Sequence, residues 1–371
     1  MRRGWKALLS VAACSGALWL LLSSVAVQTA LWSRVLRSAT PAKILFSITI
    51  SGSRDALALS TLLRALWHQD NLYLLHVDAK ALASDMAAIR NVIKQVAGAD
   101  PKNIKLVDNP VQVSWGRFSM LLTALHGLSS AIGWSSQWDF WINLSPADMP
   151  LLTADEMRLV LGALSRDRPV SFMGCTRPDW EQVRPDRRHT YMDDEGLYRS
   201  LPRPRGRLSV IQHAPKPMRG VARPPPDLFD VYKGEFWVVL HRSLAEYIHH
   251  SPDNVARSVY LYLAATYISD ELFFQTVACH PKLPASFHII NDSLRFIRWP
   301  PKSRGHPATI DDVLLEEALA SGALFARKFD HRRAPDSALA LKAALNDPQL
   351  SLRRMALTMM RTHAKGREDL C

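Results

Sequence analysis

The feature that most constrains the fold of this chain is an alternation of strand-like and helix-like segments that begins at Lys43. Residues 44–50 are apolar and rich in β-branched side chains, whereas residues 57–67 have the spacing of a buried helix face. The alternation continues with strands at 72–77, 104–107 and 140–144 and with helices at 86–96 and 120–132. This βαβ succession predicts an α/β fold with a mostly parallel central sheet flanked by helices on both faces.

Polar residues follow the predicted strands at the points where these strands end. His76 and Asp78 close the second strand, and Ser145 and Asp148 follow the strand at 140–144. Ligands of open α/β sheets bind at the carboxyl ends of the strands, so these side chains are candidates for a binding site. The alternative for both aspartates is an ordinary turn or helix-capping role.

Several nucleotide and metal motifs are absent from the sequence. It contains neither GxGxxG nor GxxxxGK[ST], which argues against a dehydrogenase or a phosphate-loop NTPase. It has no Asp-x-Asp pair, and the acidic residues 193–195 fit a solvated turn better than a metal site. Only four cysteines occur, without a CxxC or Cys/His cluster, so no structural zinc is expected and Cys175, Cys279 and Cys371 remain for any disulfide.

The N-terminus has the pattern of a membrane anchor. Arg2, Arg3 and Lys6 precede an uncharged, mostly apolar run at 7–30 that is long enough to cross a bilayer. We therefore predict a cytosolic tail at 1–6, a signal anchor at 7–30 and a short stem at 31–42. A cleaved signal peptide is the alternative, because residues 27–30 offer a small-residue cleavage site.

The net charge of +12 suits an acidic partner such as an anionic membrane surface, a nucleotide-sugar or a sulfated glycan. Nucleic acid is not the expected partner, because no recognised nucleic-acid motif accompanies the charge. Many of the basic residues fall in the proline-rich stretch 199–226, which predicts a long loop. This loop is either a lid that faces an anionic ligand or a solvated insertion.

The stretch 268–277 places an acidic pair directly before aromatic and apolar residues. Ser269 is a natural N-cap, and Asp270 and Glu271 would then lie in the first turn of a helix whose apolar residues enter the core. A carboxylate in a first turn stays ionised, as a general base must. The alternative is that the acids only complement the helix dipole.

Motifs along the chain resemble those of one enzyme family. They are Leu75-His76-Val77-Asp78, Val113-Ser114-Trp115-Gly116-Arg117, 138–145 with Asp148-Met149-Pro150, Phe236-Trp237-Val238-Val239-Leu240, 271–277, 291–295 with Trp299, and 321–329. In this order they resemble the Golgi branching glycosyltransferases, which include core-2-type N-acetylglucosaminyltransferases, protein O-xylosyltransferases and plant arabinogalactan glucuronosyltransferases. The beginning and end of the matching region are most similar to the plant glucuronosyltransferase branch.

The resemblance implies a GT-A-type, Rossmann-like catalytic domain at 43–330 in the Golgi lumen, anchored as a single-pass type II membrane protein. It implies inverting transfer of glucuronic acid, xylose or N-acetylglucosamine from a UDP-sugar to a glycan or glycoprotein hydroxyl, with Glu271 as general base. Lys328, with Arg327 beside it, would neutralise the diphosphate in place of a metal, so no cofactor is expected. A catalytically inactive homologue that binds a glycan or a partner is the alternative.

The resemblance also assigns the remaining candidate residues. Arg304 or His306 lies near a second phosphate-binding position, Asp78 near the uridine or ribose, and Asp148 near the donor sugar; Trp115 and Arg117 lie along the nucleotide-sugar site. Trp237 and Trp299 are sugar platforms or, alternatively, core tryptophans.

Departures from the family pattern leave the acceptor open. Relatives usually carry Gly-Ser-x-Trp before the Trp237 strand, whereas this chain has Gly234-Glu235-Phe236-Trp237. Of two glycosylation sequons only Asn291 is a candidate, because Asn143 lies in a presumed buried strand. The tail at 331–371 has a helical middle and a basic end, and its pattern does not decide whether it packs on the domain.

Overall fold

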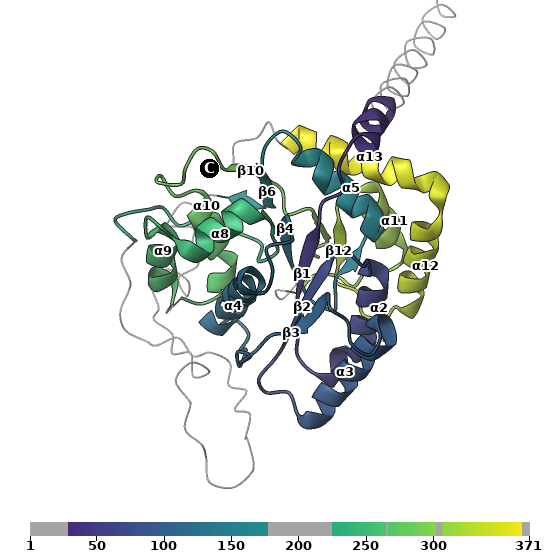
Figure 1. Cartoon of the computed structure of the whole chain (residues 1–371), viewed down its shortest axis with the longest axis horizontal. Coiled ribbons are helices and arrows are strands. Elements are labelled where there is room, and N and C mark those ends of the chain that lie inside the picture. Colours follow the sequence, from purple (N-terminus) through teal and green to yellow (C-terminus); the bar gives the residue numbers. More distant parts are fainter. Residues whose placement is uncertain (1–28, 177–224, 265, 302–305, 366–371) are drawn as a thin grey trace, which may run out of the picture.

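The central sheet of the computed structural model has seven strands and confirms the predicted fold class (Figure 1). The structure describes residues 29–176, 225–264, 266–301 and 306–365. In order across the sheet the strands are β10 (His288–Asn291), β6 (Val170–Met173), β9 (Val239–His241), β4 (Phe140–Leu144), β1 (Ile44–Ile50), β2 (Leu72–Val77) and β3 (Ile104–Leu106). Only β9 runs antiparallel to its neighbours β4 and β6. The central strands β4, β1 and β2 therefore end at the same edge.

Helices cover both faces of this sheet, because alternate residues of each strand point to opposite sides. On β1, Phe46 belongs to one hydrophobic core and Leu45 to the other. The first core contains apolar residues of α2 (Ala56–Leu66), α3 (Ala83–Ala97), α5 (Ala154–Leu164), α11 (Asp312–Ala320), α12 (Pro335–Asn346) and α13 (Pro348–Lys365). The second contains those of α4 (Phe118–Trp134), α8 (Arg242–His250), α9 (Val255–Leu263) and α10 (Phe273–Ala278). Figure 1 shows the two groups on either side of the strands.

A second sheet of three strands lies beside the edge where the central strands end. Its order is β11 (Arg295–Ile297), β12 (Phe325–Arg327) and β5 (Met149–Pro150). Because β5 directly follows Asp148, the pairing of Ala326 with Met149 brings the end of β12 to the end of β4. A two-stranded ribbon of β7 (Cys175–Thr176) and β8 (Lys233–Gly234) completes the strands of the described residues.

Two predicted elements differ from the structure. The strand expected around Trp237 is regular only from Val239, because the buried Asn143 side chain takes backbone groups of residues 236 and 238 that a neighbouring strand would otherwise pair. The helix expected from Ser269 is interrupted: a 3₁₀ turn, η3 (Ser269–Glu271), comes before α10. The N-cap residue of this 3₁₀ turn is Ile268 and not Ser269. Ile268 takes a left-handed conformation with φ 53°, and its side chain makes no capping hydrogen bond.

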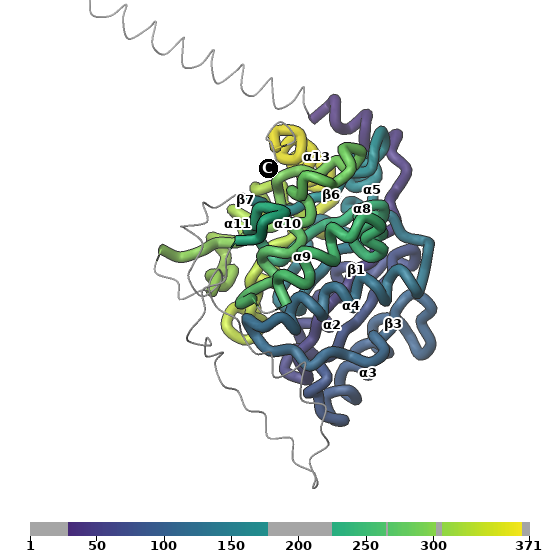
Figure 2. Tube along the Cα trace, turned by 90° about the vertical axis from the view of Figure 1, so that its left-hand side faces the viewer, coloured from purple at the N-terminus to yellow at the C-terminus, as the bar shows by residue number. Residues whose placement is uncertain are grey.

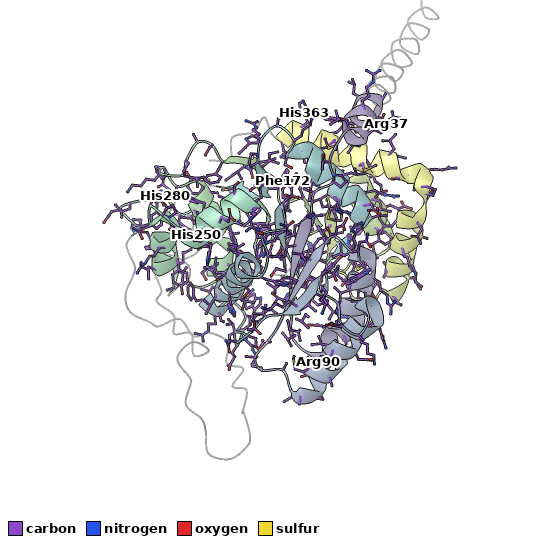
Figure 3. The ribbon with its side chains drawn as sticks, in the orientation of Figure 1. Arg37, Arg90, Phe172, His250, His280 and His363 are labelled. Carbon is purple, nitrogen blue, oxygen red and sulfur yellow. The ribbon has the colours of Figure 1, made fainter. Side chains whose placement is uncertain are left out.

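The C-terminal tail packs on the domain, a question that the sequence left open. Helix α13 lies against α5, where Arg354 binds Glu156 in a buried ion pair. Residues 29–37, which cover the end of the predicted anchor and most of the predicted stem, form a helix beside α13, with the Trp32 and His363 rings 5.9 Å apart. Figure 2 shows the two helices together at one end of the molecule, and Figure 3 labels Arg37 and His363 there.

The rest of the predicted anchor and nearly all of the basic loop at 199–226 lie outside the described residues. Within the described part of the chain, no helix combines the length and the apolar character needed to cross a membrane. Cys175 is a free buried thiol, and its Sγ lies 3.6 Å from Sγ of Cys279.

Candidate active site

Asp148 forms the floor of the candidate site. Its carboxylate is fully buried, and Oδ2 accepts hydrogen bonds from the backbone nitrogen and the hydroxyl of Ser145 at 2.8 and 2.7 Å. Arg327, at the end of β12, approaches the same carboxylate with Nη1 at 3.4 Å from Oδ1. The turn after β4 thus fixes the aspartate, and the second sheet supplies its cation.

Trp237 is held beside this pair by an asparagine of the central sheet. The side chain of Asn143 donates to the carbonyl oxygen of Phe236 at 2.8 Å and accepts from the nitrogen of Val238 at 2.8 Å. The half-buried Trp237 ring then lies under the guanidinium of Arg327, whose Cζ is 4.0 Å from the ring centroid. The Arg327 contact is a cation–π interaction, so one face of the tryptophan is already occupied.

Arg295 connects this group to the neighbouring segments. Its buried guanidinium donates to the carbonyl oxygens of Asn143 at 3.1 Å and Ser293 at 3.3 Å. Burial lowers the pKa of Arg295 to about 10, which leaves it charged at neutral pH. The sequence motif 291–295 contains this arginine but gave no role for it. Its place between the apolar residues Leu294 and Phe296 is the signal that could have marked it as buried.

Asp292 receives a cation from the C-terminal helix. Arg361 of α13 forms a bidentate pair with it, with nitrogen–oxygen distances of 2.6 and 2.7 Å. No local pattern in the tail distinguishes Arg361 from the other arginines of α13, so only the fold identifies it. The Asn291 side chain accepts a hydrogen bond from the Cys175 nitrogen and donates one to the Cys175 carbonyl oxygen. The amide of the asparagine that the sequence favoured as a glycosylation site is therefore hydrogen-bonded within the protein.

Glu271 lies at the end of η3 and is half-buried, while Asp270 before it is buried. The backbone nitrogen of Ile268 donates to the carbonyl oxygen of Gly116 at 2.9 Å, which ties this segment to the loop before α4. In that loop Trp115 is 62% exposed, and its ring meets Tyr267 edge-on at 5.9 Å. Arg117, half-buried, is the N-cap residue of α4.

Helix α10 joins the Glu271 segment to the Trp237 segment. One turn after Glu271, the Gln275 side chain donates to the carbonyl oxygen of Glu235 at 2.7 Å. The next residue, Thr276, accepts a hydrogen bond from the nitrogen of Tyr232 at 3.0 Å. Burial raises the pKa of Glu235, and the nearby arginines Arg295 and Arg327 oppose this shift only in part.

The carboxyl end of β2 organises a neighbouring cavity of about 400 Å³. Its lining includes Asp78, Asn109, Pro110 and Arg90 of α3, the last labelled in Figure 3. Asp78 accepts hydrogen bonds from the nitrogen and the ammonium group of Lys80 at 2.9 and 2.7 Å. The size of the cavity and its position at the strand ends fit a nucleoside.

His76 supports the loop beside this cavity and is 1% exposed. Its Nε2 accepts a hydrogen bond from the nitrogen of Val111 at 2.8 Å, and burial lowers its pKa to about 4. The neutral ring therefore positions the loop and presents no exposed atom to a ligand.

Lys328 is exposed at the rim, where its backbone pairs with the segment 308–310. His306 is exposed and precedes by two positions Ala308, whose carbonyl oxygen accepts a hydrogen bond from the Lys328 nitrogen. Arg304 lies outside the described residues. Trp299, 50% exposed, lies two residues beyond β11 and makes no contact that joins it to Trp237.

In the described ranges no group of three His, Cys, Asp or Glu side chains could hold a metal ion; residues 193–195 lie outside them.

Comparisons with known proteins identify a family profile, several relatives and some solved structures that this chain is similar to. The profile of the Core-2/I-Branching enzyme family matches residues 46–320. Beta-glucuronosyltransferase GlcAT14B of Arabidopsis thaliana is 30% identical over 285 residues, which cover 76% of this chain and 62% of the relative. Xylosyltransferase 1 of Homo sapiens is 26% identical over 262 residues, 70% of this chain and 24% of the relative. The galactosyltransferase LgtC, solved with donor and acceptor sugar analogs, has a TM-score of 0.38 at 13% identity and covers 84% of this chain and 99% of its own.

Proposed function

The chain belongs to the Core-2/I-Branching enzyme family, and from this premise we propose that it is an inverting, UDP-sugar-dependent glycosyltransferase of GT-A type with Glu271 as its general base. One observation carries the proposal. Glu271 is half-buried on a short turn that is hydrogen-bonded to the Trp115 loop on one side and, through Gln275, to the segment of Glu235 on the other.

The proposed reaction needs one carboxylate. Glu271 accepts the proton of an acceptor hydroxyl as that oxygen attacks the anomeric carbon from the face opposite the diphosphate. The bond from the anomeric carbon to the diphosphate oxygen breaks, and UDP leaves with its electron pair. A single displacement of this kind inverts the configuration.

Lys328 is proposed as the cation that neutralises the diphosphate, helped by Arg304 or His306. Arg327 contacts Asp148 and Trp237 in this structure, so its role is to hold these two residues rather than to bind phosphate. Asp78 and the cavity beside it take the nucleoside, Trp115 and Arg117 line its sugar side, and Trp237 lies near the sugar. The diphosphate then needs no metal, because a lysine supplies the required positive charge.

We further propose that residues 7–30 anchor the protein as a type II Golgi membrane protein whose catalytic domain is lumenal. Accessibility of an N-terminal and a C-terminal tag to protease in sealed Golgi vesicles tests this topology. Cleavage of only the N-terminal tag is the expected result, and cleavage of the C-terminal tag contradicts it.

The test of the base replaces Glu271 by glutamine, with Glu246→Gln on α8 as the matched control. We expect Glu271→Gln to lower turnover at least about 100-fold, in line with a lost general base, while UDP binding is retained. The control variant should keep its turnover, because Glu246 is 40% exposed and pairs with Arg242 of the same helix. Undiminished turnover of Glu271→Gln contradicts the assignment.

A thermal-shift screen of UDP-sugars with and without EDTA tests the cation. Stabilisation by UDP that persists in EDTA supports Lys328, and stabilisation that EDTA abolishes contradicts it. The competing function, an inactive glycan-binding homologue, requires that the wild-type protein consumes no UDP-sugar, even by hydrolysis.

A further inference from the structure

An ionic cluster of balanced charge lies where the second sheet meets the end of β4. Its cations are the guanidinium groups of Arg295, Arg327 and Arg361, and its anions are the carboxylates of Asp148, Asp292 and Glu235. Arg327 pairs with Asp148, and Arg361 pairs with Asp292. Arg295 is the remaining cation, and Glu235 is the carboxyl group near it that can balance its charge.

Part of this cluster is buried and part is partly exposed. The buried members are Asp148, Asp292 and Arg295, whereas Glu235 and Arg327, with the adjoining Trp237, are half-buried. Trp237 contacts the Arg327 guanidinium, and the charge of Arg327 also acts on the Glu235 carboxyl group. A carboxyl group, an aromatic ring and a guanidinium that lie together can hold the hydroxyl groups and ring of a sugar.

Glu235 has an oxygen that the protein leaves unsatisfied. Its Oε2 is buried and has no hydrogen-bond partner within the described part of the chain, while Ser293 bonds to the carboxyl group. A buried acceptor without a partner is costly, and a ligand hydroxyl that reaches it removes this cost.

We propose that this cluster receives the transferred sugar, that Glu235 accepts a hydrogen bond from one of its hydroxyls, and that this sugar is uncharged rather than a uronic acid. The proposal rests on the proposed function and specifies its donor. A uronate carboxylate would add an anion to a group whose guanidinium charges are already matched by Asp148, Asp292 and Glu235, and like charges in contact are strongly unfavourable. The plant relatives are glucuronosyltransferases by name, which predicts glucuronic acid as the transferred sugar instead. Donor preference therefore distinguishes the two predictions.

The experiment compares UDP-glucose with UDP-glucuronate, which differ only at C6, and adds UDP-xylose, which lacks C6. The enzyme variants are the wild type, Glu235→Gln, which removes the charge and keeps the shape, and the control Glu246→Gln. Release of UDP with and without a glycan acceptor gives kcat/KM, and thermal shifts give donor binding in Glu271→Gln, where no turnover interferes.

We expect the wild type to prefer UDP-glucose or UDP-xylose to UDP-glucuronate by at least about tenfold, the effect of a modest like-charge repulsion. Glu235→Gln should reduce this preference about tenfold. The donor preference of Glu246→Gln should equal that of the wild type, and both variants should bind UDP itself as tightly as the wild type does. Because burial raises the pKa of Glu235, the preference of the wild type should also weaken as the pH is lowered, and that of Glu235→Gln should not. The groups that face the Glu235 carboxyl group are Arg295, Arg327, Asp292 and Ser293.

The outcomes separate this inference from the proposed function. Glu271-dependent turnover that favours UDP-glucuronate, or an unchanged preference in Glu235→Gln, overturns the inference and leaves the transferase intact. Failure of the wild type to bind UDP overturns both. If Glu235→Gln does not fold, the pH dependence of the wild-type donor preference decides, and a preference that does not change with pH counts against Glu235.

Discussion

Replacing Arg354 by methionine tests whether the C-terminal helices are part of the folded core. The guanidinium is 6% exposed and its partner Glu156 is 7% exposed, with nitrogen–oxygen distances of 3.2 and 2.5 Å. The same group also donates to the carbonyl oxygens of Ala344 at 2.7 Å and Leu345 at 3.2 Å, at the end of α12. Its removal leaves a buried carboxylate without its cation and two helix carbonyls without a donor.

The loss of one partner of a buried pair costs about 3–5 kcal/mol, against at most about 1 kcal/mol for an exposed pair. For a domain of roughly 300 residues, with an unfolding entropy of about 2.1 cal/mol/K per residue, we expect the melting temperature of Arg354→Met to fall by roughly 5–8 °C. The matched control is Arg333→Met, because Arg333 is 82% exposed and pairs with Asp330 at 3.5 Å. Circular dichroism or differential scanning fluorimetry measures both variants.

A double variant gives the second arm of this test. Glu156→Gln together with Arg354→Met removes both charges, so it should be more stable than the sum of the two single effects predicts. Glutamine still accepts the hydrogen bond from the Thr153 nitrogen that starts α5, which keeps the capping box. A melting temperature of Arg354→Met equal to that of Arg333→Met would refute the reasoning.

Two further predictions concern the loops beside the site. The pKa of His76 is lowered from 6.5 to about 4, so the folded protein resists its protonation; the stability from this group is complete above pH 6.5 and falls by up to ~3 kcal/mol as the pH drops to 4. Urea unfolding across this range measures the loss, which should be smaller in His76→Gln if the histidine causes it. Gly116→Ala should lower kcat/KM at least about tenfold, because Gly116 has φ +74° and an added Cβ would lie 2.3 Å from Cε2 of Tyr267 in the segment of Glu271. Gly133→Ala in α4, whose added Cβ meets nothing within 4 Å, should leave activity unchanged, and equal effects of the two substitutions would contradict the explanation.

The sequence predicted the core of the fold well where the pattern is local. The strand expected at 44–50 coincides with β1, and the helix expected at 120–132 lies inside α4. Prediction failed where a distant residue decides the local backbone. Asn143 of β4 binds the backbone beside Trp237, 93–95 positions later, and no periodicity in the segment around Trp237 signals that contact.

The candidate site divides in the same way. Asp78 and Asp148 follow from their place after apolar strands, and Glu271 follows from an acidic pair before a buried run together with the family motifs. Their partners do not follow, because each comes from another element: Arg327 reaches Asp148 across 179 positions, and Arg361 reaches Asp292 across 69. The order of helices and strands along the chain did not indicate that α13 would supply Arg361 to this group of residues.

The sequence by itself therefore determined the succession of strands and helices, the edge of the sheet where the candidate residues Asp78 and Asp148 lie, and the family, because apolar periodicity and short motifs are local properties of a chain. Only the tertiary structure decided that His76 supports a loop rather than a substrate, that Arg327 faces Asp148 and Trp237, and that Glu235 shares one cluster with three arginines. These assignments depend on which side chains the pairing of β5 with β12 and the packing of α13 bring within a few ångströms. Burial then changes their charges and contacts, and neither effect is encoded in any single segment.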